Sequence, residues 1–580
     1  MRKKPVWYAD FETTQPNENG EVRVYLWCLC QRENKVLHGH NIDQFMKVII
    51  DKRAIIYYHN LKFDSSYITH WLLSNNRTFE VCEKSGIIYS IKFEDIELRD
   101  SMNFLPITLK EIGETYCTNY HKLDYDDYKK PYDYEPNYYD IKYCEYDVLT
   151  LKEGLTTYLK ELKTVLEENG ASNTAKKVYK KLTNAGICYE AFKEITEIDR
   201  LCERTTREMY NFYKPAYVGG YVFARGGTYI ANEKTKILML DENSMYPDKY
   251  ANYPMPIGRA FPMTNPSEIF EEGYFSIINI TIKFRLRDGY IPIISQGFNK
   301  SGGANYLSYV NDFISLTCTN VDLKYILEFY DCEWCFNYGW KYRTKVGIFK
   351  HYADIFMNIK ANSKGVRRDV AKKLLNMCYG KTAMSGINEK REYFIDELGK
   401  VASRITGYEY DDSELQYFQV GIAICSYAHA DLFETMKKVG MRNVLYTDTD
   451  SIKFLCNDES VLNNIRIDDS KLGYWKVEGH PTIFKPLAPK KYIYFEDDVI
   501  SITSAGFNHG EVFTSLKCPY HKNDKGKFES LKMSQNEALN YIKRFDFGLK
   551  VNCKQSRIVN GGRLISEVVK EIKEPKAVKL

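Results

Sequence analysis

The sequence predicts a multidomain protein of mixed helix and strand content, of the α+β and α/β classes. Its 580 residues provide for about two to four domains. Apolar, β-branched runs typical of buried strands alternate with helical stretches that carry one apolar face. A hydrophobic content of 44% and a charged content of 27% are ordinary for a globular protein. We therefore expect several packed cores, with the chemistry carried by polar residues at the ends of strands.

Composition limits the classes of partner and the compartment. The net charge is only +4, so any nucleic-acid binding must rest on local basic patches. The 15 cysteines are irregularly spaced, which favours free thiols in a reducing compartment. Cys332 and Cys335 form one Cys-x-x-Cys without a second pair, so we predict no zinc site there. The basic start has no apolar core of a signal peptide, and no stretch reaches the ~20 apolar residues of a membrane span. We expect a soluble cytosolic protein.

The first 150 residues carry one set of acidic residues. A strand over residues 6–14 delivers Asp10 and Glu12 to one face, because they are two apart. Asp64 follows a buried-strand pattern over residues 54–58, where a helix begins. Tyr143 and Asp147 are four apart and share a helix face. Four carboxylates with a tyrosine that orients the attacking water predict a two-metal hydrolytic site.

A second set begins at Asp241. It ends the buried-strand run 237–240 and precedes Ser244, which starts a helix. A carboxylate in this position is a natural ligand for a metal-bound triphosphate, and the backbone amides beyond it face phosphate oxygens. Tyr246 is placed to pack against the nucleotide sugar and to exclude a 2′-hydroxyl.

The predicted helix over residues 362–379 has two faces. Val366, Val370, Leu374 and Met377 form its apolar stripe. The opposite side is cationic, polar and aromatic, and suits a triphosphate with a stacked base; it carries Arg368, Lys372, Asn376 and Tyr379. Gly380 is expected to close the helix.

The central acidic pair is Asp448 and Asp450, between two short strands that meet in a tight turn. On an extended chain the two carboxylates face the same side. Like charges held that close are costly unless a cation is present. Oxygen ligands without His or Cys suit Mg²⁺, although an acidic turn in water is the alternative for a lone Asp-x-Asp.

Other segments give weaker signals. The glycines of Tyr217-Val218-Gly219-Gly220 permit close approach to a partner. Lys490 and Tyr492 share a strand face and are expected to hold a primer terminus. Residues 110–139 read as a Tyr- and Asp-rich surface loop without assigned chemistry. Residues 151–181 read as helical, with a solvated lysine cluster at 176–181. Residues 258–345 read as short strands with Gly-rich turns.

The first acidic set resembles, in order and spacing, the three exonuclease motifs of the DnaQ-like, RNase H-like proofreading domain. The resemblance implies that its four carboxylates, Asp10, Glu12, Asp64 and Asp147, are metal ligands. It also implies that Asn60 and Phe63 contact a single-stranded 3′ end, Phe63 by stacking.

The remaining motifs look like a family B DNA polymerase. They are Asp241…Ser244-Met245-Tyr246-Pro247, Lys372…Asn376…Tyr379-Gly380, Tyr446-Thr447-Asp448-Thr449-Asp450 and Lys490-Lys491-Tyr492. The length and Lys471-Leu472-Gly473-Tyr474-Trp475 resemble more closely the protein-primed, strand-displacing polymerases of small tailed phages, the phi-twenty-nine type. By resemblance, Asp241 and Asp450 hold two Mg²⁺ ions, which Mn²⁺ can replace, and Asp448 supports them. The resemblance also implies that Lys372, Asn376, Tyr379 and Tyr246 bind the dNTP and that Tyr217, Gly219 and Gly220 contact the template.

The resemblance also implies an RNase H-like exonuclease domain followed by a right hand of palm, fingers and thumb with two insertions. The expected ranges are exonuclease 1–170, palm 171–258 and 414–506, first terminal-protein-region insertion 259–345, fingers 346–384, second insertion 385–413 and thumb 507–580. The implied partners are primer-template and single-stranded DNA, dNTPs and a terminal protein. The chain is expected to be a monomer, or a heterodimer with the terminal protein, in the cytoplasm of an infected bacterium.

Two positions depart from the family pattern. Cys378 stands where a Ser or Thr is usual, and His429 stands where an Arg is expected, which puts a DNA contact at His429 in doubt. Three alternatives remain: an ordinary nucleic-acid-primed family B enzyme, a reverse transcriptase or other palm polymerase, and a binding-only phage protein. The first would have no specific use for the insertions, and the second would not explain the first acidic set.

Overall fold

The computed structural model describes residues 4–574, except residues 19, 32, 85, 125–129, 299–303, 398, 524–525 and 560–561. The basic start at residues 1–3, part of the Tyr- and Asp-rich loop and the last six residues therefore lie outside the described residues.

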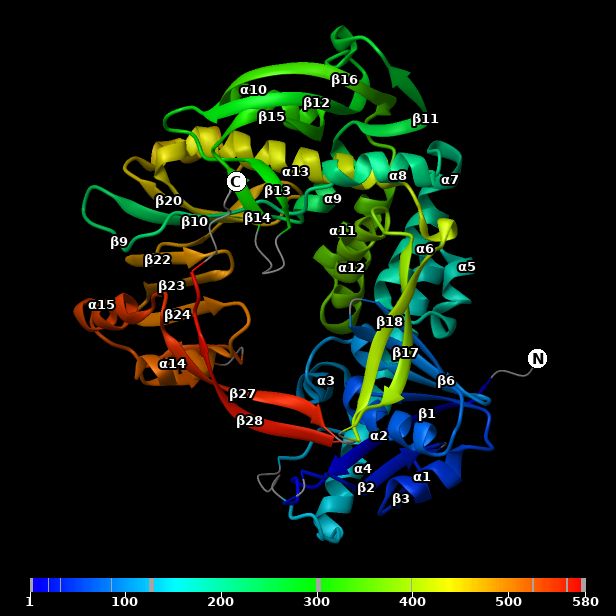
Figure 1. Cartoon of the computed structure of the whole chain (residues 1–580). Coiled ribbons are helices and arrows are strands. Elements are labelled where there is room, and N and C mark those ends of the chain that lie inside the picture. Colours follow the sequence, from blue (N-terminus) through cyan, green and yellow to red (C-terminus); the bar gives the residue numbers. More distant parts are fainter. Residues whose placement is uncertain are drawn as a thin grey trace.

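The N-terminal part is a seven-stranded sheet covered by helices on both faces (Figure 1). Its strand order is β3-β2-β1-β4-β7-β6-β5, and β4 lies parallel to β1 and β7. The strands are β1 (Val6–Thr13), β2 (Val24–Cys30), β3 (Val36–Gly39), β4 (Ala54–Tyr58), β5 (Glu80–Lys84), β6 (Ile87–Phe93) and β7 (Ile96–Asp100). Helices α1 (Ile42–Ile49) and α2 (Leu61–Ser74) share a core with one face, while α3 (Leu109–Tyr116) and α4 (Tyr138–Glu168) pack on the other.

Short helices lead from this part to a five-stranded sheet of order β21-β10-β20-β19-β8. The connecting helices are α5 (Ser172–Ala175), α6 (Asn184–Thr196), α7 (Ile198–Leu201) and α8 (Arg207–Tyr213). The strands are β8 (Val222–Ala224), β10 (Lys236–Glu242), β19 (Val444–Asp448), β20 (Ser451–Cys456) and β21 (Trp475–Gly479). Helix α9 (Met245–Asn252) follows β10 directly. The buried helix α13 (Phe418–Val439) shares a core with β10 and β20.

A four-stranded antiparallel sheet lies above α13 in Figure 1. Its strands are β11 (Met255–Met263), β12 (Tyr274–Leu286), β15 (Tyr309–Thr319) and β16 (Tyr330–Lys345), with α10 (Asn320–Phe329) between the last two and the hairpin β13 (Ile294–Phe298)–β14 (Ala304–Leu307) beside them. The strands are long, so the prediction of short strands was wrong. The predicted boundary at residue 259 falls inside β11.

The remaining elements surround the centre of the molecule. Helices α11 (Lys350–Asn362) and α12 (Gly365–Met377) pack together, followed by the hairpin β17 (Ile387–Ile395)–β18 (Val401–Tyr410). A six-stranded sheet contains β9 (Tyr229–Ile230), β22 (Ile483–Ala488), β23 (Lys491–Glu496), β24 (Val499–Ser504), β25 (Tyr520–Lys522) and β26 (Phe528–Ser530). Helices α14 (His509–Leu516) and α15 (Gln535–Arg544) and the hairpin β27 (Lys550–Val559)–β28 (Gly562–Glu571) complete the described chain.

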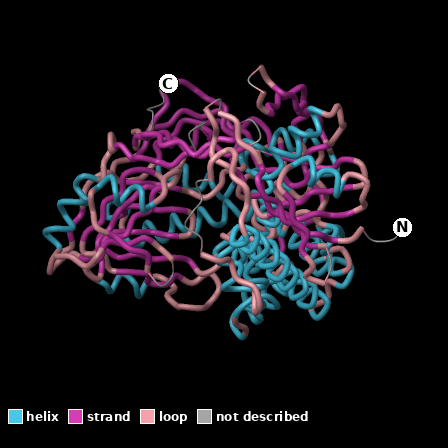
Figure 2. The backbone as a smooth tube through the Cα atoms, turned by 90° about the horizontal axis from the view of Figure 1, so that it is seen from below, coloured by secondary structure: helices cyan, strands magenta, loops and turns pink. Residues whose placement is uncertain are grey.

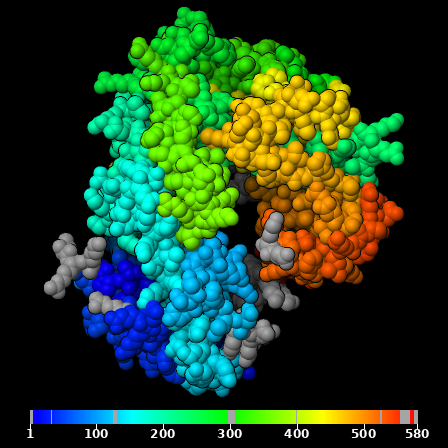
Figure 3. Space-filling view, turned by 180° about the vertical axis from the view of Figure 1, so that it is seen from behind, coloured from blue at the N-terminus to red at the C-terminus, as the bar shows by residue number. Residues whose placement is uncertain are grey.

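The elements enclose a central hollow. Strands β17, β18 and β28 all contact α2, so the two long hairpins meet at the N-terminal part (Figure 1). Figure 2 shows strand-rich regions on either side of a helical centre. The space-filling view shows the molecule hollowed between the side of α11 and α12 and the side of β22–β24 (Figure 3).

Several local predictions need correction. The helix predicted over 362–379 is the single helix α12, which begins only at Gly365 because Ser363 and Lys364 are extended, and which ends at Met377. Gly380 lies in a 3-10 turn without a positive φ, so it is not a left-handed helix cap. The helix predicted up to residue 181 ends at Glu168, and only two short helical turns follow it.

Candidate active sites

The first acidic set comes together around β1, an interior strand of the N-terminal sheet, between residues of β1, α2 and α4. Strand β1 carries Asp10 and Glu12, and a ligand oxygen of each lies within 4.8 Å of the other. Asp64 lies in the first turn of α2. Asp147 lies in the N-terminal third of α4, one turn after Tyr143. Oxygen Oδ1 of Asp64 and Oδ1 of Asp147 are buried without a hydrogen-bond partner among the described residues.

These carboxylates are electrostatically strained against one another. Burial, followed by the charge of Asp147, raises the pKa of Asp10 to about 7. Burial raises the pKa of Asp147 to about 6 even though Lys122 opposes it. The pKa values of Glu12 and Asp64 are also well above their ordinary values, mainly through burial and then through Asp10. Buried oxygens without partners and mutual repulsion are what a hard divalent cation relieves, so the residues fit a metal site.

Lys122 belongs to this site, although the sequence assigned its segment no chemistry. Its ammonium donates to Oδ2 of Asp147 and lies 4.3 Å from the centre of the Tyr143 ring. Burial lowers the pKa of Lys122, but Asp147 outweighs this effect and the net shift is upward. No spacing rule links Lys122 to Asp147, so only the folded chain reveals the pair.

The two residues predicted to contact a 3′ end lie at the start of α2, within four residues of Asp64. Asn60 is exposed and takes a left-handed conformation with φ of 70° just before the helix. Phe63 is half-buried, and its ring centre lies 5.8 Å from that of Tyr67 in an edge-on contact. This partly exposed ring lies directly before Asp64 on the same helix turn.

The second acidic set lies where β10 meets the β19–β20 hairpin. Asp241 pairs with Ser451 across the sheet, and the backbone N–H of Glu242 donates to the carbonyl of Asp450 at 2.7 Å. Asp448 ends β19, whereas Asp450 lies in the two-residue turn with Thr449, whose φ is 61°. The predicted tight turn is confirmed, but the argument that both side chains point one way along a strand was wrong.

Burial, followed by Asp450 and Glu478, raises the pKa of Asp241 to about 7. Burial also raises the pKa of Asp450. Glu478 lies on β21 beside them and was not predicted. As in the first set, converging carboxylates with raised pKa values fit a divalent cation.

Cations and aromatic rings from other elements face this set. Lys360 on α11 donates to the hydroxyl of Ser244 at 2.9 Å. Burial, and then the charges of Arg368, Lys372 and Lys476, lower the pKa of Lys360, which places four cations in one neighbourhood. The rings of Tyr246 and Tyr379 stack with centres 4.1 Å apart. Asn376 is half-buried on the same helix as Lys372. Sequence reasoning missed Lys360 and Lys476, because they come from elements remote in sequence.

The residues predicted to contact primer and template lie around the hairpin turn. A Cβ built on Gly220 would lie 2.2 Å from the hydroxyl of Thr449, so only glycine fits there. Tyr217 is half-buried, with its ring centre 5.4 Å from that of Phe418. Lys490 precedes β23 in a turn with φ of 56°, so it does not share a strand face with Tyr492 as predicted. The ring of Tyr492 lies 4.9 Å from that of Tyr446.

A comparison with protein families matches residues 46–141 and 121–454 to the family described as DNA polymerase type B, organellar and viral. These matches span more than half of the chain. The chain belongs to this family.

Several curated relatives of this type B polymerase are phage DNA polymerases. The DNA polymerase of Streptococcus phage Cp-1 is 28% identical over 617 residues, which cover 98% of this chain and 99% of the relative. The DNA polymerase of Bacillus phage phi29 is 27% identical over 548 residues, which cover 89% and 91%. The solved phi29 DNA polymerase complexed with primer-template DNA and incoming nucleotide substrates matches with a TM-score of 0.80 at 22% identity, covering 98% of this chain and all of that one.

These findings confirm the predicted fold class, and the chain is a DNA-directed DNA polymerase. The family implies use of divalent metal ions, and Asp10 and Glu12 of the first set lie close enough together to bind one. No helix in the described part of the chain is long and apolar enough to cross a membrane.

The two departures from the polymerase family pattern have structural explanations. Cys378 is buried, and its thiol donates to the carbonyl of Leu375 at 3.5 Å, which a Ser hydroxyl could do equally. The Nε2 of His429 lies 2.6 Å from the carbonyl oxygen of Gly219, and its Nδ1 lies 3.5 Å from Asp322 on α10. His429 is 8% exposed, so it supports the Gly219–Gly220 segment from the protein interior.

Proposed function

We propose that this polymerase replicates a linear phage genome by protein priming, displaces the non-template strand and proofreads with a 3′–5′ exonuclease. The observation that carries the proofreading part of the proposal is the presence of two separate carboxylate sets, one at β1, α2 and α4 and the other at β10 and the β19–β20 turn. Each set combines buried, mutually repelling carboxylates with nearby lysines, Lys122 at the first set and Lys476 and Lys453 at the second. One set alone would account for one reaction, whereas synthesis and proofreading need two sites.

At the exonuclease site, Asp10, Glu12, Asp64 and Asp147 would hold the metal ions. Lys122 keeps Asp147 ionised and oriented through its hydrogen bond. Tyr143 lies under the same ammonium and would orient the attacking water. Asn60 and Phe63 would hold the last nucleotides of a frayed 3′ end, Phe63 by stacking on a base.

At the polymerase site, Asp241 and Asp450 would hold the ions and Asp448 would support them. Two bound Mg²⁺ ions, for which Mn²⁺ can substitute, supply activation of the attacking hydroxyl and neutralisation of the charge on the leaving pyrophosphate. Lys372, with Lys360 and Arg368, would bind the triphosphate of the dNTP. Tyr246 and Tyr379 would pack on its sugar and base, and Asn376 would help to position it.

In the first step of replication, a hydroxyl of a terminal protein attacks the α-phosphorus of a dNTP, and pyrophosphate leaves. The four-stranded sheet module at residues 259–345 would dock that protein. Tyr217, Gly219 and Gly220 would guide the template, and Lys490 with Tyr492 would hold the primer terminus. The polymerase would act in the bacterial cytoplasm, as a monomer or as a heterodimer with the terminal protein.

The hairpin β17–β18, within residues 385–413, supports the proposal of strand displacement. Lys84 on β5 donates to the carbonyl of Ser385 at 3.0 Å and pairs with Glu414 at 3.1 Å, at the base of the hairpin. Arg391 on β17 pairs with Glu83 at 2.9 Å. These contacts fix the hairpin against the N-terminal part, next to α2, where β28 also arrives. A closed ring would keep the enzyme on its template while it separates the downstream duplex.

The alternative is an ordinary nucleic-acid-primed type B enzyme, which shares both carboxylate sets. Extension of a primer on a single-stranded circle, with Mg²⁺ and dNTPs and without helicase, distinguishes the two. Products many circle-lengths long are expected. Products of one circle or less would contradict strand displacement and favour the ordinary polymerase.

A further inference from the structure

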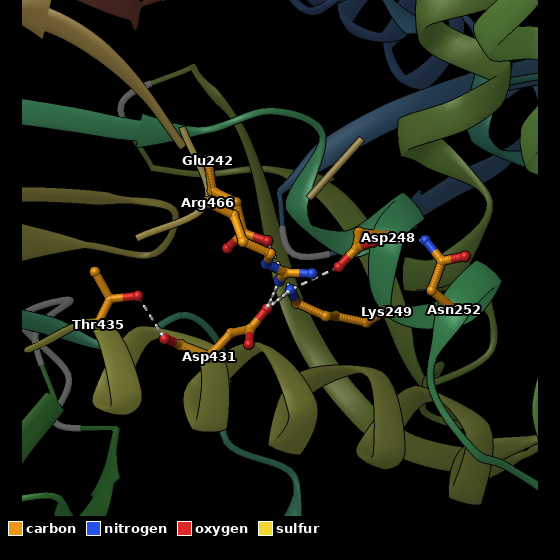
Figure 4. Close-up of polar contacts among 7 residues, drawn as sticks. All are labelled: Glu242, Asp248, Lys249, Asn252, Asp431, Thr435 and Arg466. Atoms are coloured by element: carbon orange, nitrogen blue, oxygen red, sulfur yellow. Dashed lines mark hydrogen bonds and ion pairs between the residues drawn. The ribbon is translucent and has the colours of Figure 1, made fainter. Parts of the chain in front are cut away.

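A fully buried lysine lies directly behind the polymerase carboxylates. Lys249 on α9 is 0% exposed. Its ammonium donates to Oε1 of Glu242 at 2.6 Å, to Oδ2 of Asp248 at 2.9 Å and to Oδ2 of Asp431 on α13. Figure 4 shows the three carboxylates converging on the lysine, with Arg466 alongside.

The cluster has more negative than positive groups. Arg466 pairs with Asp431 at 3.3 Å, so three carboxylates face two cations. Although burial by itself lowers the pKa of Lys249, Glu242, Asp431 and Asp248 raise it above its ordinary value. Lys249 is therefore charged wherever the enzyme works, and it cannot be removed without leaving buried carboxylates short of a partner.

The cluster is tied to both metal-binding carboxylates through the backbone of Glu242. Glu242 follows Asp241 on β10, and its side chain points to the opposite face of the strand. Its N–H donates to the carbonyl of Asp450 at 2.7 Å. Whatever fixes Glu242 therefore fixes the end of β10 and the hairpin turn relative to each other.

Asp248, a second carboxylate of the cluster, holds the residues around the turn between β10 and α9. Asn252 donates to Oδ1 of Asp248 at 2.7 Å. Gly473 lies so close that an added Cβ would be 2.2 Å from Cγ of Asp248. The N–H of Gly473 donates to the carbonyl of Asn243, and the N–H of Asn243 donates to the carbonyl of Tyr474, both at 2.9 Å. The turn between β10 and α9 is thus held both by the Lys249 cluster and by its backbone hydrogen bonds to Gly473 and Tyr474.

We propose that Lys249 is a positioning residue for the polymerase site, which it serves by holding Glu242 and thereby the relative placement of Asp241 and Asp450. The inference rests on the proposed metal-binding role of those two carboxylates. Lys249 itself touches neither substrate nor metal ion. A residue that orients ligands in this way typically changes metal affinity by about 10- to 100-fold when it is replaced.

The test measures metal binding directly. In an Asp10→Ala, Asp64→Ala background, which removes the exonuclease ligands, Mn²⁺ binding is followed by electron paramagnetic resonance of the free ion. Glu242→Gln keeps the shape of the side chain and removes its charge-assisted bond to Lys249. We expect it to raise the dissociation constant of Mn²⁺ by about tenfold and to raise the Mg²⁺ concentration for half-maximal extension in parallel.

Two matched variants separate positioning from simple loss of charge or stability. Asp431→Asn removes one negative charge from the same cluster but leaves the Glu242–Lys249 bond, so its Mn²⁺ affinity should stay close to the parent's. Lys130→Met removes another buried lysine, which pairs with Asp140 at 3.4 Å in the N-terminal part, and should lower stability without changing Mn²⁺ binding. Lys249→Met should weaken Mn²⁺ binding at least as much as Glu242→Gln does.

If Lys249→Met does not fold, Glu242→Gln alone still tests the proposal, because it removes the charge-assisted bond between Glu242 and Lys249. A folded Glu242→Gln with parental Mn²⁺ affinity and Mg²⁺ dependence would overturn the proposal. An equal loss in Asp431→Asn would also overturn it, since charge alone would then be responsible. If the parent itself shows no Mn²⁺ binding that Asp241→Asn abolishes, the proposed function of the site fails instead.

Discussion

Lys490 holds both carboxylate oxygens of Asp448, with its ammonium 2.9 Å from each. The backbone N–H of Lys490 also donates to the Tyr446 hydroxyl at 2.9 Å. The lysine predicted to grip the primer is therefore already attached to the first aspartate of the central pair. If Lys490 contacts the primer phosphate as proposed, Asp448 would place this cation in addition to supporting the metal ions.

Lys490→Gln is expected to weaken binding of primer-template DNA and to lower the slope of log affinity against log salt by about one, because one phosphate contact is lost. If Asp448 acts by placing Lys490, the double variant Asp448→Asn, Lys490→Gln should bind primer-template DNA as tightly as Lys490→Gln alone. Fluorescence anisotropy at several salt concentrations measures both effects. Additive losses would mean that Asp448 acts independently of the lysine.

Asp450→Asn is expected to reduce primer extension at least about a hundredfold, as the loss of one electrostatic stabiliser does, while 3′–5′ degradation continues. Asp10→Ala with Asp64→Ala should have the reverse effect, because these residues lie in the N-terminal part, at a separate site. Both activities are measured on one labelled primer-template, with and without dNTPs. Loss of both activities in either variant would contradict the assignment of two sites.

Lys122→Met is expected to lower exonuclease activity at neutral pH by about 10- to 100-fold, the usual effect of removing a group that orients a ligand. Lys122 lowers the pKa values of Asp10 and Asp147, so its loss raises them. The acidic limb of the exonuclease pH profile should therefore move to higher pH, while the profile of primer extension stays in place. An unshifted exonuclease limb would show that Lys122 does not tune these carboxylates.

Tyr246→Ala is expected to improve the use of ribonucleotides relative to deoxyribonucleotides at least about tenfold, since a single steric contact commonly discriminates by this factor. The Tyr246 ring is held by its stack on Tyr379, so it cannot simply move aside for a 2′-hydroxyl. The ratio of kcat/KM for ATP and dATP is the measurement, with Tyr246→Phe as the matched control that keeps the ring. An unchanged ratio in Tyr246→Ala would place the discriminating contact elsewhere.

The metal-free protein is expected to lose stability as pH rises from about 4 to about 7. In the folded state the pKa of Asp10 is about 7 and that of Asp147 is about 6, above the values near 4 of an unfolded chain. Between these values the folded state binds more protons than the unfolded state, so stability falls with rising pH. Thermal unfolding in EDTA should show this decline, and Mg²⁺ should reverse it by binding the ionised carboxylates.

The Asp10→Ala, Asp64→Ala variant is the control for this pH dependence, and its decline should be shallower. A metal-free parent as stable at pH 7 as at pH 5 would contradict the buried, repelling arrangement of the N-terminal carboxylates.

Local patterns in the sequence were enough to predict several of the elements that carry the two sites. Alternation placed Asp10 and Glu12 on one strand, helical spacing placed Tyr143 and Asp147 on one helix face, and flanking β-branched residues predicted the hairpin at Thr449. These succeed because strand and helix periods act over a few residues. The same locality explains the failures: the extended Ser363 and Lys364, which delay the start of α12, and the left-handed Lys490 are single-residue conformations that a helix or strand period does not predict.

Which charged groups meet depends on long-range packing. Lys122 reaches Asp147, Lys360 reaches Ser244, and Lys249 joins Glu242 to Asp431 on a helix 182 residues away in sequence. A lysine in a sequence is by default a solvated surface charge. Whether it is instead buried against carboxylates depends on how sheets and helices from distant segments pack, and that packing has no signature in the residues next to it.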